Sequence, residues 1–165
     1  MLLSSFIVLF YSLCLFAAMR DIVSLIIPNW MNGLFVLLFL PVIFIAGLDW
    51  TLIGLHFAIA FATLILTFTL FAFNIIGGGD AKMIPAVILW MGPSASMPFL
   101  FGTSVCGGLL AIIILLLRTY IPPELAPSFA QKLLDKKNGI PYGAAILAGV
   151  IMATPSSIIL SRLAY

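Results

Sequence analysis

The sequence predicts an all-α, polytopic membrane protein with six transmembrane helices, on the basis of three observations. Of its 165 residues, 64% are hydrophobic and 7% are charged, whereas about half of a soluble domain is apolar and about 25% is charged. The apolar residues form long runs, and a crossing of the bilayer needs about 20 of them. The few basic residues lie mainly in alternate loops. We therefore expect one transmembrane domain, residues 1–165, with the lipid bilayer as its solvent.

Six apolar runs are candidates for transmembrane helices. Polar residues separate them, for example Arg20–Asp21 after the first run and Pro28–Asn29 before the second. The first run has neither a basic segment before it nor a small-x-small cleavage site after it, so we expect a retained helix rather than a signal peptide. The predicted spans are Leu2–Ala18, Trp30–Leu48, Thr51–Ile75, Ala81–Met91, Met97–Leu117 and Tyr142–Leu160.

The fourth predicted span, Ala81–Met91, is short. A helix from Asp80 to Met91 rises about 18 Å at about 1.5 Å per residue, whereas the hydrocarbon core of a bilayer is about 30 Å thick. Gly77–Gly79 precedes this span and Gly92–Pro93 follows it. It can complete a crossing only if its Asp80 end lies in a recess below the membrane surface, lined by water or protein.

Basic residues orient the predicted spans. One side of a six-span arrangement carries six of them and the other side carries only Arg162, so the positive-inside rule makes the first side cytosolic. Both termini are then expected outside. Trp30 falls at the cytosolic boundary and Trp50 and Trp90 fall at external boundaries, as in an aromatic belt. The net charge of +2 is too small to suggest nucleic acid as a partner. The six cytosolic basic residues are Arg20, Lys82, Arg118, Lys132, Lys136 and Lys137.

The longest predicted loop, Arg118–Ile140, is cytosolic. Ser128 and Gln131 have the spacing of a capping box. Phe129, Leu133 and Leu134 would share one face of the helix that follows. We therefore expect a short amphipathic helix on the inner leaflet. It is either an ordinary anchored loop or a surface on which a substrate docks.

Asp21 and Asp80 are the residues that call most for a functional explanation. An ionised side chain at membrane depth costs on the order of 2.5–3.5 kcal/mol. Asp80 follows Gly77-Gly78-Gly79, where glycine permits a close approach of the backbone, and the sequence predicts that it caps the next helix. Asp21 ends the first span. The predicted topology brings both carboxylates to the cytosolic side, on helices that can meet.

Two facing carboxylates can hydrolyse a peptide without a metal. One ionised aspartate takes a proton from water, while the other, protonated, donates to the scissile carbonyl oxygen, and the pair shares one proton. The alternative is structural: Asp80 only caps a helix and Asp21 only pairs with Arg20. The chain has one histidine and two cysteines, and both cysteines fall inside predicted spans, so we expect neither a metal site nor a cofactor.

Three segments of the chain resemble the type IV prepilin peptidases, a family of intramembrane aspartic proteases. Gly77-Gly78-Gly79-Asp80 is similar to their Gly-x-Gly-Asp signature. Asp21 followed by Ile27-Pro28-Asn29 is similar to their first-aspartate segment. Pro141-Tyr142-Gly143 is similar to a Pro-Phe-Gly before their last helix. The three segments keep their order and spacing, and the resemblance covers the whole chain.

The resemblance implies a fold, a reaction and a set of site residues. Asp21 and Asp80 would be the catalytic pair of an endopeptidase in the bacterial inner membrane. Its substrate would be a prepilin, whose short basic leader, followed by a hydrophobic helix, is cut beside the cytosolic surface. The motifs imply supporting roles for Gly77, Gly79, Lys82, Pro28, Asn29, Pro141 and Gly143.

Longer members of that family carry a Cys-x-x-Cys insert and also methylate the new N-terminus. This chain has only Cys14 and Cys106. It therefore resembles the short, peptidase-only form found with tight-adherence pilus systems, and we do not expect methyltransferase activity.

Other interpretations remain open at this point. Lys82 either acts near Asp80 or serves only as a positive-inside residue. His56 and Ser104 fall in the outer halves of their predicted spans and would form a serine-protease dyad if they met, although no nucleophile elbow surrounds Ser104. A small transporter or channel subunit would use its aspartates to bind protons or cations and Gly77–Gly79 as a broken-helix site. Such a protein would show inverted repeats, which this sequence does not.

Overall fold

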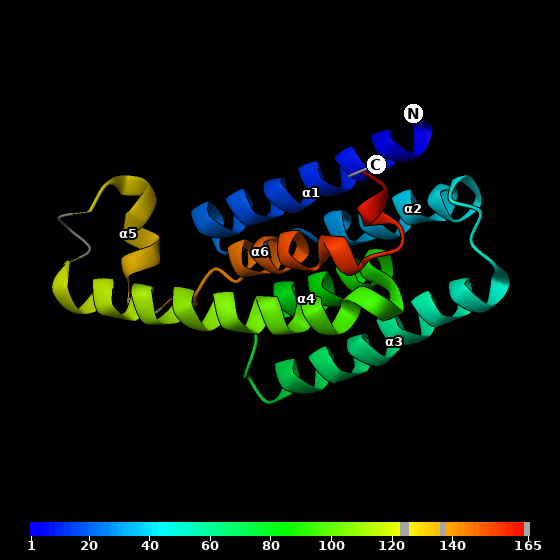
Figure 1. Cartoon of the computed structure of the whole chain (residues 1–165). Coiled ribbons are helices and arrows are strands. Elements are labelled where there is room, and N and C mark those ends of the chain that lie inside the picture. Colours follow the sequence, from blue (N-terminus) through cyan, green and yellow to red (C-terminus); the bar gives the residue numbers. More distant parts are fainter. Residues whose placement is uncertain (123–125, 136–137, 164–165) are drawn as a thin grey trace.

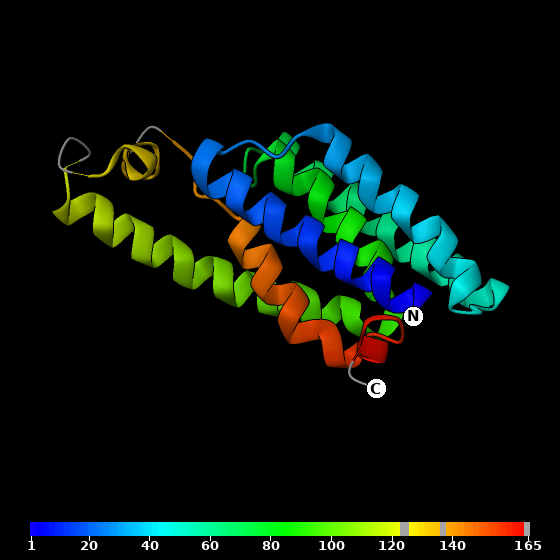
Figure 2. The ribbon, with the colours of Figure 1, turned by 90° about the horizontal axis from the view of Figure 1, so that it is seen from above.

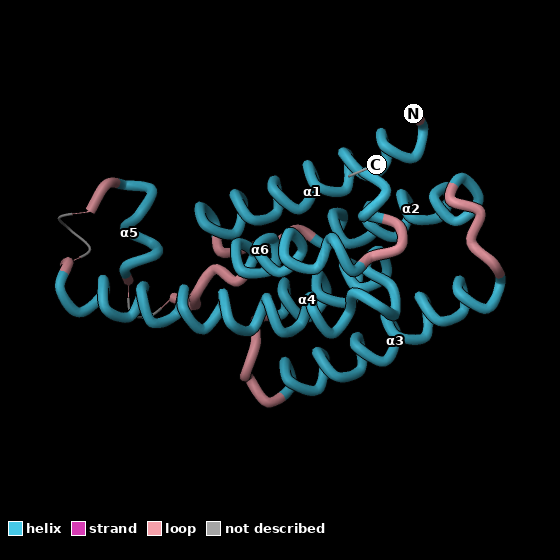
Figure 3. Tube along the Cα trace, in the orientation of Figure 1, coloured by secondary structure: helices cyan, strands magenta, loops and turns pink. Residues whose placement is uncertain are grey.

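The computed structural model describes residues 1–122, 126–135 and 138–163, and these ranges are helical without any β-strand (Figures 1 and 3). The predicted all-α fold is therefore confirmed. Five helices form an elongated bundle, with the short α5 at one end of it (Figures 1 and 2). The helices are α1 (Leu2–Ser24), α2 (Asn29–Ile45), α3 (Trp50–Ala72), α4 (Gly78–Tyr120), α5 (Ser128–Leu134) and α6 (Gly143–Ala153), followed by the 3-10 turns η2 (Thr154–Ser156) and η3 (Leu160–Leu163).

The outer surface of the bundle has the character of a membrane protein. In the described residues, three helices are long and apolar enough to cross a membrane, namely α1, α3 and α4, while α2 and the segment Gly143–Ser156 are shorter apolar helices. Large apolar side chains face outward, such as Phe44, Phe61 and Ile65. Lipid is the solvent that such a surface requires. Six crossings and external termini stay predictions.

Helix α4 reverses its direction at Gly92. Its first arm, residues 78–91, and its second arm, residues 93–120, run in opposite senses (Figures 1 and 2). Gly92 has φ 73° and ψ −177°, a conformation that glycine adopts without the steric cost paid by other residues. The sequence predicted a boundary at Gly92–Pro93, and the structure confirms it.

Side chains of α3 bond to main-chain carbonyls of α4 that lack a helical partner. The first arm ends at Gly92, so the carbonyl of Leu89 in its last turn has no helical partner, and it accepts a hydrogen bond from Nδ1 of His56 at 2.7 Å. Proline has no N–H, so the carbonyl four residues before it loses its helical partner. Pro85 frees the carbonyl of Ala81, and Oγ1 of Thr67 lies 2.7 Å from it. These polar contacts fix the first arm of α4 against α3.

The first arm of α4 forms the centre of the bundle. The predicted place of Trp90 in an external aromatic belt is wrong, because its side chain is fully buried. The ring stacks on Phe10 with centroids 4.7 Å apart, and its Nε1–H donates to the Phe35 carbonyl at 2.9 Å. Met83, Val87, Ile88 and Met91 are also almost wholly buried. The short fourth segment is thus surrounded by protein rather than by lipid, which removes the need for it to span the hydrocarbon core by itself.

Three predicted elements differ from the structure at their ends. The first span was predicted to end at Ala18, but α1 continues through Arg20 and Asp21 to Ser24, and it stops where Leu25 adopts a left-handed conformation. The final helix was predicted to run to Leu160, but α6 ends at Ala153, because Pro155 cannot continue its hydrogen-bond ladder and Ser157 is extended. The short loop helix exists as α5, but it begins at Ser128 with Pro127 at the N-cap. The predicted capping box with Ser128 as the cap is therefore wrong. Lys136, Lys137 and the side chain of Phe129 lie outside the described residues.

The two ends of the bundle differ. The N-terminus of α1 and the turn η3 lie at one end (Figures 1 and 2). The C-terminus of α1, the start of α4 and α5 lie toward the other end, which carries the predicted site residues.

Candidate active site

Asp21 and Asp80 line one cavity of about 780 Å³. The end of α1, the turn before α4, the end of α4 and the segment before α6 all contribute to its wall. The structure therefore brings the two predicted aspartates to a common space from helices that are far apart in the sequence. The residues that line the cavity are Asp21, Leu25, Ile26, Ile27, Phe71, Asn74, Ile75, Ile76, Gly77, Gly78, Gly79, Asp80, Arg118, Asn138, Gly139, Ile140 and Tyr142.

Asp21 is fixed by the start of α6. It is 6% exposed, and its Oδ2 accepts a hydrogen bond from the main-chain N–H of Gly143 at 2.7 Å. This N–H belongs to the first turn of α6, where N–H groups have no partner within the helix. In the described part of the chain, the hydrogen-bond partner of Asp21 is Gly143 rather than Arg20, so the interpretation that Asp21 only pairs with Arg20 finds no support.

Gly143 allows α6 to approach α1 closely. A Cβ atom added to Gly143 would lie 2.9 Å from Cβ of Asp21 and 3.2 Å from Cα of Ala18. Real Cβ atoms essentially never come as close as the first distance, so another residue at this position would push the two helices apart. The Pro141-Tyr142-Gly143 motif thus has a geometric reason: Gly143 permits the approach that brings its N–H to Asp21.

Asp80 lies in the first turn of α4, but it is not the cap. The N-cap is Gly77, and no side chain caps the helix, so the predicted capping role of Asp80 is wrong. The helix starts earlier than predicted because Gly78 and Gly79 adopt helical conformations. A carboxylate in the first turn is still stabilised by the helix dipole. Asp80 is 8% exposed and lines the same cavity as Asp21.

The three glycines before Asp80 allow tight packing around the cavity. A Cβ on Gly77 would lie 2.9 Å from Oδ2 of Asp80, and one on Gly78 would lie 3.0 Å from the Phe71 ring. A Cβ on Gly79 would lie 3.3 Å from Cβ of Ile27. The glycine run therefore lets the start of α4 contact both the end of α3 and the segment that joins α1 to α2.

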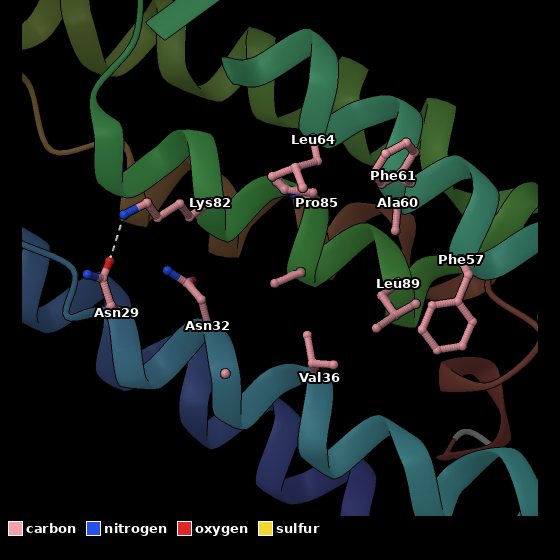
Figure 4. Close-up of a pocket in the computed structure, with 12 residues that line it drawn as sticks. Asn29, Asn32, Val36, Phe57, Ala60, Phe61, Leu64, Lys82, Pro85 and Leu89 are labelled. Atoms are coloured by element: carbon pink, nitrogen blue, oxygen red, sulfur yellow. Dashed lines mark hydrogen bonds between the residues drawn. The ribbon is translucent and has the colours of Figure 1, made fainter. Parts of the chain in front are cut away.

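Lys82 does not line the aspartate cavity. Its Nζ donates a hydrogen bond to Oδ1 of Asn29 at 2.9 Å, and both residues line a separate groove (Figure 4). The contact links the start of α4 to the start of α2, where Pro28 is the N-cap. Pro28 and Pro141 flank the aspartate cavity, because their neighbours Ile27 and Tyr142 line it.

Arg118 is a cavity residue that the sequence did not single out. It is 8% exposed, its Nε–H donates to the Leu133 carbonyl at 2.9 Å, and its Nη2 donates to the Gly139 carbonyl at 2.8 Å. The guanidinium thus fastens the end of α5 and the segment before α6 to the end of α4. In the sequence, Arg118 was noted only as one of the basic residues on the predicted cytosolic side. The only other indication of a role was its position at the end of a long apolar run.

His56 and Ser104 do not form a dyad. Nδ1 of His56 is bonded to the Leu89 carbonyl, and the hydroxyl of Ser104 donates to the Leu100 carbonyl of its own helix at 2.8 Å. The structure gives His56 a part in the reversal of α4 instead. The carboxylate pair is therefore the better candidate for chemistry, because its two members share a cavity wide enough for a peptide segment and water.

Comparison with known proteins identifies a family. A model of the type IV leader peptidase family matches residues 8–112, a range that includes Asp21 and Asp80. A search of curated proteins and a search of solved structures each found no match.

Proposed function

Since this chain belongs to the type IV leader peptidase family, and is thereby a membrane peptidase, we propose that Asp21 and Asp80 are its catalytic pair and that its substrates are prepilin-like proteins. The observation that carries this proposal is the cavity that the two buried aspartates share. Asp80 is not the cap of α4, and Asp21 accepts its hydrogen bond through Oδ2 from a main-chain N–H.

The proposed reaction needs one proton shared by the pair. The ionised aspartate accepts a proton from water as the water oxygen bonds to the scissile carbonyl carbon, and the protonated aspartate donates to the carbonyl oxygen. The resulting diol collapses when the C–N bond breaks. The amine nitrogen then takes the proton held by the first aspartate, and a hydroxyl of the diol returns one to the second. Both side chains end in the states in which they started.

The location of the cavity agrees with a leader peptide as substrate. It lies toward the end of the bundle that carries α5 and Arg118, which the distribution of basic residues assigns to the cytosol. A leader would enter from the cytosol, while the hydrophobic helix that follows it stays in the bilayer. We propose the inner membrane of a bacterium as the location. Membership in a peptidase family favours this function over a transporter.

The test is co-expression with a candidate prepilin and detection of cleavage by a gel shift. Asp21→Asn and Asp80→Asn should each abolish cleavage, because each keeps the size of the side chain but removes the acid–base function. Asp49→Asn is the control: Asp49 caps α3 through a hydrogen bond from the Leu52 N–H at 3.2 Å, and asparagine caps helices equally well.

Two outcomes would contradict the proposal. Full cleavage by either single aspartate variant would exclude a dyad. A loss of activity in EDTA would indicate metal chemistry, although the described residues contain no group of three or more His, Cys, Asp or Glu side chains that could hold an ion.

A further inference from the structure

A second cavity, of about 570 Å³, lies between α2, α3 and the first arm of α4 (Figure 4). We call it the α2–α3 groove. Polar residues lie at one end of the groove and apolar residues line the remainder. The groove could therefore accommodate a molecule with a polar head and an apolar chain. The lining residues are Asn29, Asn32, Gly33, Val36, Phe57, Ala60, Phe61, Leu64, Lys82, Pro85, Ala86 and Leu89.

The polar end of the groove has unused hydrogen-bonding and charge capacity. In the described part of the chain, the hydrogen-bond partner of Lys82 is the neutral Asn29 and no carboxylate pairs with it. Both amide atoms of Asn32 are enclosed and have no partner among the described residues. Figure 4 shows this amide on the same side of the groove as Lys82. The amide atoms of Asn32 are covered by protein, so Lys82 and Asn29 are the polar side chains that a molecule in the groove can contact.

We propose that the α2–α3 groove binds one anionic phospholipid. Its phosphate lies at Lys82 and Asn29, and one acyl chain extends along the apolar wall toward Phe57 and Leu89. Charge complementarity selects the anion, because an ammonium with a neutral partner attracts a phosphate. The groove lies in a surface that the bilayer covers, so lipid is the molecule present there at high concentration.

The charge of the groove favours an anionic lipid over the substrate. A basic leader would be repelled by Lys82, whereas a phosphate would be attracted to it. The lipid would pack against the same helical arm that carries Asp80, but on the side away from the aspartate cavity.

Native mass spectrometry of the purified chain in a neutral detergent tests this proposal. The probes are phosphatidylglycerol and phosphatidylcholine with identical acyl chains. The chain should retain one phosphatidylglycerol molecule more tightly than phosphatidylcholine. Lys82→Gln should weaken phosphatidylglycerol binding about fivefold, as expected for the loss of one lysine near a lipid phosphate, and should leave phosphatidylcholine binding nearly unchanged. Lys132→Gln, which alters an exposed lysine on α5, should change neither.

A matched pair of glycine variants tests the apolar wall. Gly33 lines the groove and Gly54 does not, and a Cβ added to either meets no atom within 4 Å. Gly33→Leu should therefore fold and weaken the binding of both lipids, whereas Gly54→Leu should bind both as the unaltered chain does.

Three results would overturn the proposal: equal affinity for the two lipids, equal binding by Lys82→Gln and the unaltered chain, or equal effects of the two leucine variants. Displacement of phosphatidylglycerol by a peptide with the hydrophobic helix of a prepilin would assign the groove to substrate instead. Each readout is a binding measurement, so it stands or fails independently of the aspartate pair.

Discussion

The main-chain N–H of Gly143 donates a hydrogen bond to Oδ2 of Asp21 at 2.7 Å, across a separation of 122 residues in the sequence. It is a direct link between α6 and one of the two carboxylates of the candidate site. The link depends on the absence of a side chain at Gly143, because any Cβ there would meet both Asp21 and the backbone of α1 at Ala18. The first prediction follows from this contact.

Gly143→Ala should reduce cleavage of a prepilin at least tenfold, because a displaced α6 withdraws the N–H from Asp21. The added methyl group should also lower the free energy of unfolding by about 1–3 kcal/mol, as overpacking does. A gel-shift time course and thermal unfolding in detergent measure the two effects. Gly108→Ala is the control, since a Cβ at Gly108 meets nothing within 4 Å. Cleavage by Gly143→Ala at the unaltered rate would show that this contact has no catalytic role.

The contact between Thr67 and the Ala81 carbonyl predicts an unusual double-mutant result. Thr67→Val leaves a buried carbonyl without a partner and should lower the free energy of unfolding by about 1–3 kcal/mol. Pro85→Ala restores the N–H that this carbonyl lacks, so Thr67→Val should cost much less in that background. Thr69→Val is the matched control, because the Thr69 hydroxyl is exposed and bonds only within its own helix, to Ile65. Equal costs of Thr67→Val in both backgrounds would refute the compensation.

Arg118 should affect cleavage through the segment that it fastens. Arg118→Lys keeps the charge but cannot reproduce the fork that bonds both Leu133 and Gly139. We expect kcat/KM for a prepilin to fall on the order of tenfold, as for the loss of one hydrogen bond from a charged donor. Most of the change should appear in KM if the segment forms a wall for substrate. Lys132→Gln should be nearly silent, and an equal loss in both variants would point to a general charge effect.

Cysteine labelling tests the prediction that the end of the bundle with α5 faces the cytosol. In a background with Cys14→Ala and Cys106→Ala, Lys132→Cys should react with a membrane-impermeant maleimide only after the cells are opened. Thr51→Cys, at the start of α3, should react in intact cells. Both positions are exposed, so burial does not confound the result. The reverse pattern would place the aspartate cavity on the wrong side for a cytosolic leader.

Hydropathy predicted where the helices are, but not which of them face lipid. The bilayer and the protein interior are both apolar, so the hydropathy of the run Ala81–Met91 would be the same whether the run is buried in protein or exposed to lipid. Its glycine boundaries at Gly77–Gly79 and Gly92 were visible in the sequence, because glycine and proline act on the backbone locally. The first arm of α4, which contains Trp90, lies in the centre of the bundle. Its position depends on contacts between residues that are distant in the sequence, and a single sequence does not reveal such contacts.

Some residues of the candidate site were also predictable from the sequence, and others were not. Asp21 and Asp80 stood out because acids are rare at membrane depth, and the cavity they share agrees with the sequence prediction. Arg118 did not stand out, because a basic residue at the end of a span is ordinary and its acceptors are main-chain carbonyls, which every residue has. The side of α4 on which Lys82 lies, toward Asn29 and away from Asp80, was likewise set by packing that the sequence pattern did not specify.

The bond from Gly143 to Asp21 also bears on biogenesis. Ribosomes make the chain from its N-terminus, so α1 and Asp21 enter the membrane while Gly143 has yet to be synthesised. Until α6 emerges, Asp21 lacks its hydrogen-bond donor, and the second arm of α4 lacks the helix against which Gly102 and Gly107 pack. A nascent chain that stops before α6 therefore carries both acids but has no completed site. If the two aspartates are the catalytic pair, we expect proteolytic competence to arise late in synthesis, after α1 to α4 have been made.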